Sequence, residues 1–598
     1  MTDAGALPGN TFGIRDPEAF ACNLARLLEE AGKAASAYLK PREGSLATPD
    51  FGNNLAEVVK TLDEVGKYWL AEPGRALEAQ NRLFAAYTGL WTASLQRMIG
   101  LPAAPFASPD PGDRRFADPE WSSNQFFDFL KQFYLVTARW AAAMVEDAGG
   151  LEPHTRQKAA FYVRQIANAL APSNFAFTNP EVLRETLAEN AGNLVRGMHM
   201  LAEDIKAGHG ELKIRQSGRG EFKLGENLAA TPGKVIHQND LCQLIQYKPT
   251  TKKVLKRPLL IVPPWINKFY ILDLTPEKSF IGWAVAQGHT VFVVSWVNPD
   301  KHQERKSFEH YMRAGVIESL DVIGKVTGAK AINAAGYCVG GTILSVALAW
   351  MAATGDTRIK SATLFATQVD FTYAGDLKVF ADEEQISAVE KQMSVRGYLE
   401  GRNMAAAFNM LRSNDMIWPY VISNYFKGKE PPPFDLLYWN SDTTRMPAAN
   451  HSFYLRQCYL DNTLAEGTMD IGGITLDLKQ VKVPVYNLAT REDHIAPARS
   501  VFYGSSFFGG KVTFVLAGSG HIAGVINSPV RNKHQYWTGP APKGDGYAEW
   551  LKKTKEHPGS WWPHWQKWIE AQDDSQVKAR PVGKGIEAAP GSYVRVKA

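Results

Sequence analysis

Gly336-Tyr337-Cys338-Val339-Gly340 joins a predicted strand to a predicted helix. Residues 329–335 are apolar and predict the strand, and residues 342–353 are apolar without a breaker and predict the helix. A tight strand-to-helix turn needs glycine on both sides of its central residue, because side chains there would clash. The helix N-terminus then favours the thiolate of Cys338. The pentapeptide predicts a nucleophile elbow; the alternative is a buried structural cysteine beside a glycine turn.

Two later segments supply an acid and a histidine. Residues 483–489 predict a strand that runs into a polar turn with Asp493 at its tip. Residues 511–516 predict another strand, which ends in a glycine-rich loop that presents His521. Nucleophile, acid and histidine follow their strands in the order found in α/β-hydrolases. We therefore predict a catalytic triad of Cys338, Asp493 and His521.

Neighbouring residues leave alternatives for two triad positions. Glu492 competes with Asp493, which is favoured because a short carboxylate usually follows this strand in the hydrolase turn. His494 is a second candidate base beside His521. The oxyanion donors are expected to be the backbone N–H of Val339 and one from the loop at Ile266, after the strand predicted within residues 257–264.

The hydrophobic pattern divides the chain into two domains. Residues 1–210 are mostly helical by their three- and four-residue spacing, and residues 211–598 alternate strands with helices, as a doubly wound parallel sheet requires. We expect an α/β-hydrolase domain with a cap inserted at about 370–479, because a bare hydrolase needs fewer residues between nucleophile and acid. A cap excludes water from the site. The residues from Asp573 onward, rich in Pro, Gly and Lys, are expected to form a loose tail.

Composition narrows the class of protein. The 598 residues carry a formal net charge of +5, too weak a basic bias to indicate nucleic-acid binding. No window has the roughly 18 apolar residues of a membrane span, and no signal peptide is visible, so we expect a cytoplasmic protein. The four cysteines have neither metal-ligand nor disulfide spacing, and we expect no metal and no cofactor. They are Cys22, Cys242, Cys338 and Cys458.

Several long motifs together resemble class I polyhydroxyalkanoate synthases. They are Gly336–Thr342, Pro263–Leu274, Leu437–Pro447, Arg491–Pro497, Gly518–Gly524, Arg114–Trp121 and Pro172–Phe175. The resemblance covers most of the chain and places the family's catalytic cysteine, aspartate and histidine on Cys338, Asp493 and His521. It places a further family aspartate, implicated in chain growth, on Asp273, where a structural role is equally plausible. His494 is kept with Asp273 as a second-line candidate for substrate handling.

The resemblance implies a substrate, partners and a place in the cell. The substrate is (R)-3-hydroxyacyl-coenzyme A, of short chain by the Gly-Tyr-Cys-Val context, and the products are a polyester and coenzyme A. The enzyme is expected to be a homodimer on cytoplasmic polymer granules, with phasin-type coat proteins as further partners. An aromatic stripe, Phe126, Phe127, Phe129 and Phe133, serves either core packing or such a contact.

Two other functions compete with polymerisation. An acyl-CoA thioesterase, or a related α/β-hydrolase, would use the same Cys-His-Asp triad, and the long cap speaks against it. A granule-coating protein without activity would need only the helical region, and the ordered triad speaks against it.

Overall fold

The computed structural model describes residues 13–39, 51–218, 220 and 222–598, with the backbone alone for 51–55. The chain forms two compact units. The first holds the residues up to Gly218 together with Phe408–Pro433, and the second holds Arg219–Ala407 and Phe434–Ala598. The mostly helical N-terminal region and the α/β region are confirmed. The segment Phe408–Pro433, inside the expected cap, belongs to the helical unit instead.

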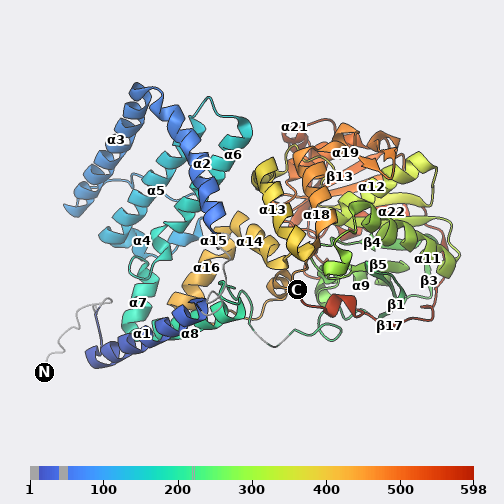
Figure 1. Ribbon diagram of the computed structural model, residues 1–598, viewed down its shortest axis with the longest axis horizontal. Helices are drawn as coiled ribbons and strands as arrows, with labels where there is room; N and C mark the ends of the chain where they lie inside the picture. The colour runs from blue at the N-terminus through green and yellow to red at the C-terminus, as the bar shows by residue number, and fades with distance from the viewer. Residues whose placement is uncertain (1–12, 40–50, 219, 221) are drawn as a thin grey trace. The chain divides into compact units, whose positions relative to one another are not determined.

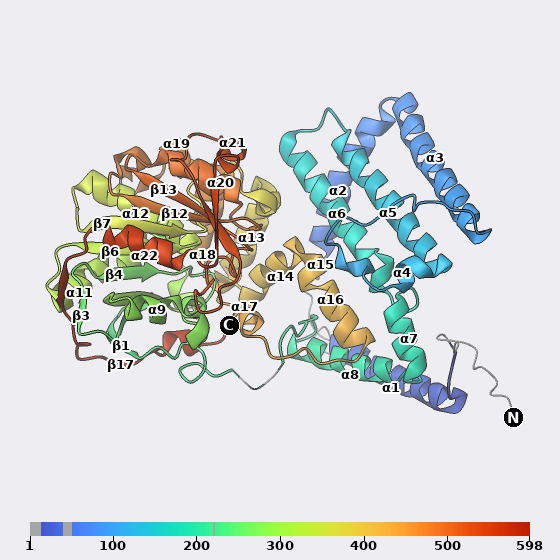
Figure 2. The same ribbon diagram turned by 180° about the vertical axis from the view of Figure 1, so that it is seen from behind.

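The first unit is built from long amphipathic helices and short turns. Asn179 caps one helix as predicted, since its side chain accepts hydrogen bonds from the backbone N–H groups of Glu181 and Val182. The main elements are α1 (Pro17–Leu39), α2 (Phe51–Leu70), α3 (Pro73–Met98), α4 (Glu120–Ser123), α5 (Gln125–Glu146), α6 (Pro153–Ala169), α7 (Pro180–Ala188) and α8 (Gly192–Ala207), joined later by α15 (Ser413–Met416), α16 (Trp418–Tyr420) and the π-helical η9 (Val421–Phe426). Figures 1 and 2 show α16 beside α7 and α8.

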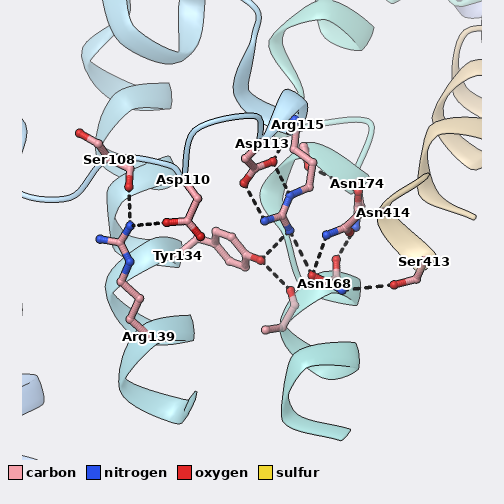
Figure 3. A network of polar contacts seen from close by, with 12 residues as sticks. Ser108, Asp110, Asp113, Arg115, Tyr134, Arg139, Asn168, Asn174, Ser413 and Asn414 are labelled. Carbon is pink, nitrogen blue, oxygen red and sulfur yellow. Dashed lines mark hydrogen bonds and ion pairs between the residues drawn. The ribbon is translucent and has the colours of Figure 1, made fainter. Parts of the chain in front are cut away.

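Hydrogen bonds hold Phe408–Pro433 in this unit. In the network of Figure 3, Asn168 of α6 donates to the hydroxyl of Ser413 (3.2 Å), and Asn414 donates to the side-chain oxygen of Asn168 (2.8 Å). Further along, the hydroxyl of Tyr425 donates to the buried carboxylate of Asp204 on α8 (2.7 Å). These hydrogen bonds join polar groups that are far apart in the sequence. The spacing of hydrophobic residues cannot predict such pairs.

The aromatic stripe at the start of α5 divides between core and surface. Phe127 is buried, Phe129 packs against Trp91 of α3 with ring centroids 5.0 Å apart, and Phe126 is 62% exposed. Phe133 stacks on Tyr87 and is still 41% exposed. One side of the stripe therefore packs between helices and the other side is open.

The second unit is a twisted eleven-stranded sheet in the order β15-β14-β13-β12-β7-β6-β4-β5-β2-β1-β17. Its central strands are parallel and fully buried, as their continuous apolar runs predict. The predicted hairpin at 233–247 is confirmed as the antiparallel pair of β1 and β2. The bounds are β1 (Gly233–Gln238), β2 (Cys242–Tyr247), β4 (Leu259–Val262), β5 (Val291–Trp296), β6 (Ile332–Tyr337), β7 (Ile359–Phe365), β12 (Val485–Thr490), β13 (Val512–Ala517), β14 (Gln535–Thr538), β15 (Lys555–Pro558) and β17 (Glu587–Ala588).

Helices cover both faces of this sheet (Figures 1 and 2). On one face Phe280 of α9 (Phe280–Ala286) packs edge-on against Trp562 of α22 (Trp562–Glu570), with ring centroids 5.2 Å apart. The other face carries α11 (Glu318–Thr327) and α12 (Val339–Thr354), which begins directly after β6. Such a doubly wound sheet places its reactive groups at the carboxyl ends of the parallel strands.

The insertion between β7 and β12 contributes further helices and short strands. They are α13 (Glu383–Arg396), β8 (Tyr398–Leu399), α14 (Gly401–Leu411), α17 (Asp435–Ser441), β9 (Met446–Pro447), α18 (Ala448–Phe453), the π-helical η10 (Tyr454–Leu460), α19 (Thr463–Glu466), β10 (Asp470–Ile471) and β11 (Ile474–Thr475). The chain passes into the helical unit within α14, at Phe408, and returns at Phe434.

The expectation of a loose tail after Asp573 is wrong. Strand β17 pairs with the edge strand β1, and β16 (Gln576–Lys578) pairs with β3 (Lys253–Leu255). The buried ammonium of Lys268 donates to the carbonyl oxygens of Val594 (2.8 Å) and Val596 (2.7 Å) and pairs with Asp442 (2.9 Å). Edge pairing and a buried cation hold a segment whose composition alone suggested disorder.

Candidate active site

Cys338 occupies a strained turn between β6 and α12. Its backbone has φ 52° and ψ −126°, on the left-handed side that residues other than glycine rarely adopt. The N–H of Cys338 donates to the carbonyl of Phe365 on β7 (2.9 Å), which fixes the turn against the sheet. Backbone strain at an exposed strand-to-helix turn is the mark of a nucleophile elbow. The predicted elbow is present.

The glycines around Cys338 are needed for close backbone packing. A Cβ on Gly336 would lie 2.5 Å from the Cα of Gly341, and one on Gly340 would lie 2.2 Å from the carbonyl oxygen of Val262. The backbones of strand and helix leave no room for either methyl group. This is the steric reason for the glycine pattern around the cysteine.

Asp493 and His521 form a directed pair at the ends of β12 and β13. Nδ1 of His521 lies 2.7 Å from Oδ2 of Asp493. Oδ1 of Asp493 accepts the backbone N–H groups of Ile495 and Ala496, both at 2.9 Å, and Oδ2 accepts the hydroxyl of Thr490 at 2.8 Å. The carboxylate is therefore held rigidly and accepts a hydrogen bond from the Nδ1–H group, which leaves Nε2 of the imidazole as the basic atom.

The environment shifts the pKa of both partners. Burial acts to raise the pKa of Asp493, but His521 and the N–H groups of Ala496 and Ile495 hold it below its ordinary value. Burial acts to lower the pKa of His521, but Asp493 and Cys338 raise it to about 10. An ionised carboxylate thus makes the imidazole a strong enough base to accept a proton from a thiol at neutral pH.

The side chain of Cys338 interacts with the imidazole of His521. The Cys338 side chain is half-buried, and its charge contributes to the raised pKa of His521. Burial is the main cause of the raised pKa values of Tyr454 and Tyr459, whose rings meet edge-on at 5.5 Å. Tyr459 raises the pKa of Tyr454 further, and Cys338 adds to both shifts. The structure therefore brings together the predicted cysteine, aspartate and histidine.

The two tyrosines are functional candidates that the sequence analysis missed. They come from the π-helical η10, where their rings are in edge-on contact. Tyr337, also unpredicted, stacks on the His521 ring at 5.4 Å and donates from its hydroxyl to the His521 carbonyl (3.1 Å). Only the Leu437–Pro447 motif a few residues earlier hinted at this region.

The two predicted oxyanion donors lie at the start of α12 and in the loop after β4. Val339 is the first residue of α12, so its N–H is one of those that a helix leaves without an intrahelical partner. Ile266 lies in the loop after β4, where the hydroxyl of Thr444 donates to the carbonyls of Trp265 (2.7 Å) and Ile266 (2.5 Å). These bonds fix the loop and orient its backbone.

Asp273 and His494, the two further candidates, take no part in the hydrogen bond between Asp493 and His521. Asp273 is buried in a separate cluster, where its Oδ1 accepts hydrogen bonds from the hydroxyls of Thr231 (2.5 Å) and Ser279 (2.6 Å). Burial raises the pKa of Asp273 despite these bonds. His494 follows Asp493 directly, and its carbonyl oxygen lies 3.6 Å from the position of a Cβ on Gly375.

Comparison with known proteins adds independent evidence. Residues 112–284 match the family described as "Poly-beta-hydroxybutyrate polymerase (PhaC) N-terminus", and residues 258–527 match "alpha/beta hydrolase fold". A poly(3-hydroxyalkanoate) polymerase subunit of Rhizobium meliloti is 60% identical over 98% of this chain and 96% of its own length. The polymerase of Methylorubrum extorquens is 57% identical over 98% of each chain. The polymerase subunit of Cupriavidus necator is 39% identical over 92% of each.

The chain belongs to the poly(3-hydroxyalkanoate) polymerase family. Membership confirms the resemblance to class I synthases, the α/β-hydrolase fold and the prediction of an enzyme. Within the described residues of this polymerase, no group of three or more His, Cys, Asp or Glu side chains is arranged to hold a metal ion. No helix among those residues has the length and apolar character to cross a membrane.

Proposed function

We propose that this polymerase carries the acyl group as a thioester on Cys338, takes (R)-3-hydroxyacyl-coenzyme A and releases coenzyme A. The single observation behind this proposal is the strained Cys338 beside His521, whose Nδ1 is held by Asp493 at 2.7 Å. The short-chain substrate, 3-hydroxybutyryl-coenzyme A, follows from the Gly-Tyr-Cys-Val context of the family motif.

The proposed reaction begins with acylation of the enzyme. His521 takes the proton of the Cys338 thiol, and the thiolate attacks the thioester carbonyl of the substrate. The carbon–sulfur bond to coenzyme A breaks, and the departing sulfur takes the proton back from His521. One thioester replaces another, so the acyl group keeps its activation.

Chain growth follows with oxygen as the nucleophile. His521 takes the proton of an incoming 3-hydroxyl, the oxygen attacks the acyl carbonyl on Cys338, and the bond to sulfur breaks. The product is an oxygen ester and the cysteine is regenerated. Asp493 keeps the imidazole oriented and balances its charge through both steps. The N–H groups of Val339 and Ile266 stabilise the tetrahedral oxyanion, each contributing about 3–4 kcal/mol.

Burial of the aromatic residues near Cys338 supports polymerisation rather than hydrolysis. Trp265, Tyr454 and Tyr459 are each less than 10% exposed. A dry wall beside the thioester disfavours attack by water and leaves the substrate hydroxyl as the better nucleophile.

One assay separates these functions. Purified protein is mixed with (R)-3-hydroxybutyryl-coenzyme A, and coenzyme A release, free acid and turbidity are followed together. Polymerisation predicts coenzyme A and turbidity without free acid, whereas free acid formed in step with coenzyme A would establish a hydrolase.

The nucleophile is tested by substitution. Cys338→Ala is expected to abolish coenzyme A release while the far-ultraviolet spectrum stays that of the wild type. Cys338→Ser is expected to acylate slowly and turn over more slowly still, because its hydroxyl ionises less readily. Cys22→Ala, at an exposed cysteine on α1, is the control and is expected to keep activity. Activity of Cys338→Ala above a few per cent of wild type would refute the assignment.

We further propose that the enzyme is a cytoplasmic homodimer that stays on its polyester granule, with phasin-type coat proteins as neighbours. An apolar, insoluble product supports attachment, as do exposed apolar side chains of the helical unit. Leu77, Phe84 and Trp91 of α3 recur every seven residues and are more than half exposed. Granule fractionation and light scattering of the purified protein test these points.

A further inference from the structure

Two buried polar side chains of the α/β unit have no hydrogen-bond partner among the described residues. The side chain of Asn450 is fully buried, and in the described part of the chain neither its amide nitrogen nor its oxygen has a hydrogen-bond partner. Trp265 is 2% exposed, and its indole Nε1 likewise has none among the described residues. A buried polar group left unpaired costs about 1–3 kcal/mol, so unpaired groups placed together point to an occupant.

Helix geometry places these two groups in one layer. On α18, Asn450 lies one turn before Phe453 and Tyr454 and therefore shares their side of the helix. Phe453 stacks on Phe308 at 5.1 Å, and Tyr454 meets the Trp265 ring at 6.0 Å. Trp265 itself packs against Phe308 at 5.7 Å. Asn450 therefore faces the aromatic layer that contains Trp265.

The loop that carries Trp265 packs against the elbow, because a Cβ on Gly340, two residues after Cys338, would lie 2.5 Å from the carbonyl oxygen of Pro263, two residues before Trp265. Tyr454 shares a face with Asn450, and burial, Tyr459 and, to a smaller extent, Cys338 raise its pKa. Trp265 is bonded in sequence to Ile266, the proposed oxyanion donor, and its backbone is fixed by Thr444. The unpaired indole is therefore carried by a loop that packs on the elbow, and the unpaired amide by a helix that meets the same aromatic layer.

We propose that Asn450 and the indole N–H of Trp265 bind the oxygen on C3 of the 3-hydroxyacyl group during loading of Cys338. The inference rests on the proposed function and deepens it. An indole donates one hydrogen bond, while an amide both donates and accepts, so together they match a hydroxyl group. The 3-hydroxyl is the polar atom that separates this substrate from an ordinary acyl-coenzyme A. The two side chains thus act as specificity determinants.

The test compares two substrates that differ only in that hydroxyl. Single-turnover release of coenzyme A is measured with (R)-3-hydroxybutyryl-coenzyme A and with butyryl-coenzyme A, at a series of concentrations. Wild-type protein is expected to acylate faster with the hydroxylated substrate. Asn450→Leu is expected to lower the acylation rate constant for that substrate about tenfold or more. The rate constant for butyryl-coenzyme A is expected to stay within about twofold of the wild-type value.

Two further variants make the result decisive. Trp265→Phe removes the indole N–H and keeps an aromatic ring, so it is expected to show a smaller loss with the same selectivity. It also carries the test should Asn450→Leu fail to fold. Ser452→Ala is the control on the same helix, since Ser452 donates to Glu390 on another side of α18. This control is expected to leave the acylation rate constants for both substrates unchanged.

The outcomes separate failure of this inference from failure of the proposed function. An equal loss with both substrates would show that Asn450 only packs the site, and no loss with either would show that the layer holds only water. Either result overturns the inference while the polymerase mechanism stands. If the wild type releases no coenzyme A from either substrate, the proposed function fails and the inference fails with it.

Discussion

At the scale of single residues, the site combines a strained backbone with a polarised imidazole. Cys338 keeps a φ of 52° because β7 and α12 hold the turn from both sides. His521 has its Nδ1 occupied by Asp493, and its pKa is raised to about 10. The strained turn orients the sulfur, and the pair of Asp493 and His521 supplies the base. Nucleophilic attack by Cys338 needs both features.

The raised pKa of His521 makes a contribution to stability that depends on pH. Because the folded value, about 10, exceeds the ordinary value of 6.5, this contribution is complete below pH 6.5 and is lost as pH rises through about 10. The difference in urea midpoint between wild type and His521→Gln is therefore expected to be largest near pH 6 and to shrink toward pH 10. The measurement is urea unfolding at pH 6, 8 and 10.

The control for that experiment is His302→Gln, at a histidine whose side chain is 88% exposed. This variant shows how much the urea midpoint changes with pH when an exposed histidine is replaced. A wild-type to His521→Gln difference that stays constant over this pH range would contradict the assignment of an ionised pair. The same His521→Gln protein is expected to lose activity by about 10²–10⁴-fold, because no base then generates the thiolate or the attacking oxygen.

At the scale of elements, close backbone contact joins α8 to η9. A Cβ on Gly197 of α8 would lie 2.0 Å from the carbonyl oxygen of Tyr425. Gly197→Ala therefore forces two backbones apart and is expected to destabilise the helical unit by about 1–3 kcal/mol. The measurement is thermal unfolding, together with limited proteolysis of the segment Phe408–Pro433.

Gly66→Ala on α2 is the matched control. A Cβ there meets no atom within 4 Å. Since alanine is the better helix former by up to about 1 kcal/mol, this variant is expected to be neutral or slightly stabilised. Equal effects of the two substitutions would mean that the contact between Gly197 and Tyr425 does not determine the packing of η9.

At the scale of the whole molecule, the two units are not consecutive stretches of chain. Phe408–Pro433 leaves the α/β unit and completes the helical one, where the side chain of Asn424 donates to the Arg215 carbonyl (2.8 Å). Removal of the N-terminal region alone therefore strips this segment of its partners. A truncation that respects the structure must remove both pieces.

Two truncations test this reading. Deletion of residues 1–218 alone is expected to give an aggregating protein that is cleaved within 408–433. The same deletion with 408–433 replaced by a glycine-serine linker is expected to stay folded and to acylate Cys338, but to bind granules and dimerise less. Circular dichroism, proteolysis, single-turnover acylation and granule fractionation are the measurements. A plain deletion as soluble as the linker version would contradict the division into these units.

Local sequence determined the elbow, the order of the reactive residues and the class of fold. Glycine spacing around Cys338 and polar turns after buried strands are local features, because steric clash and strand burial act between near neighbours. Hence β6, α12, β12 and β13 were predicted within a few residues, and the predicted cysteine, acid and histidine lie together.

Tertiary structure alone decided the partners of segments that are far apart in the chain. Periodicity shows which face of a segment is apolar, but not which surface will cover it. For this reason the pairing of β17 with β1, the passage of Phe408–Pro433 into the helical unit and the wall formed by Tyr454 and Tyr459 were not predicted. Asn450 shows the same limit, since only its complete burial without a partner among the described residues distinguishes it from an ordinary helix residue.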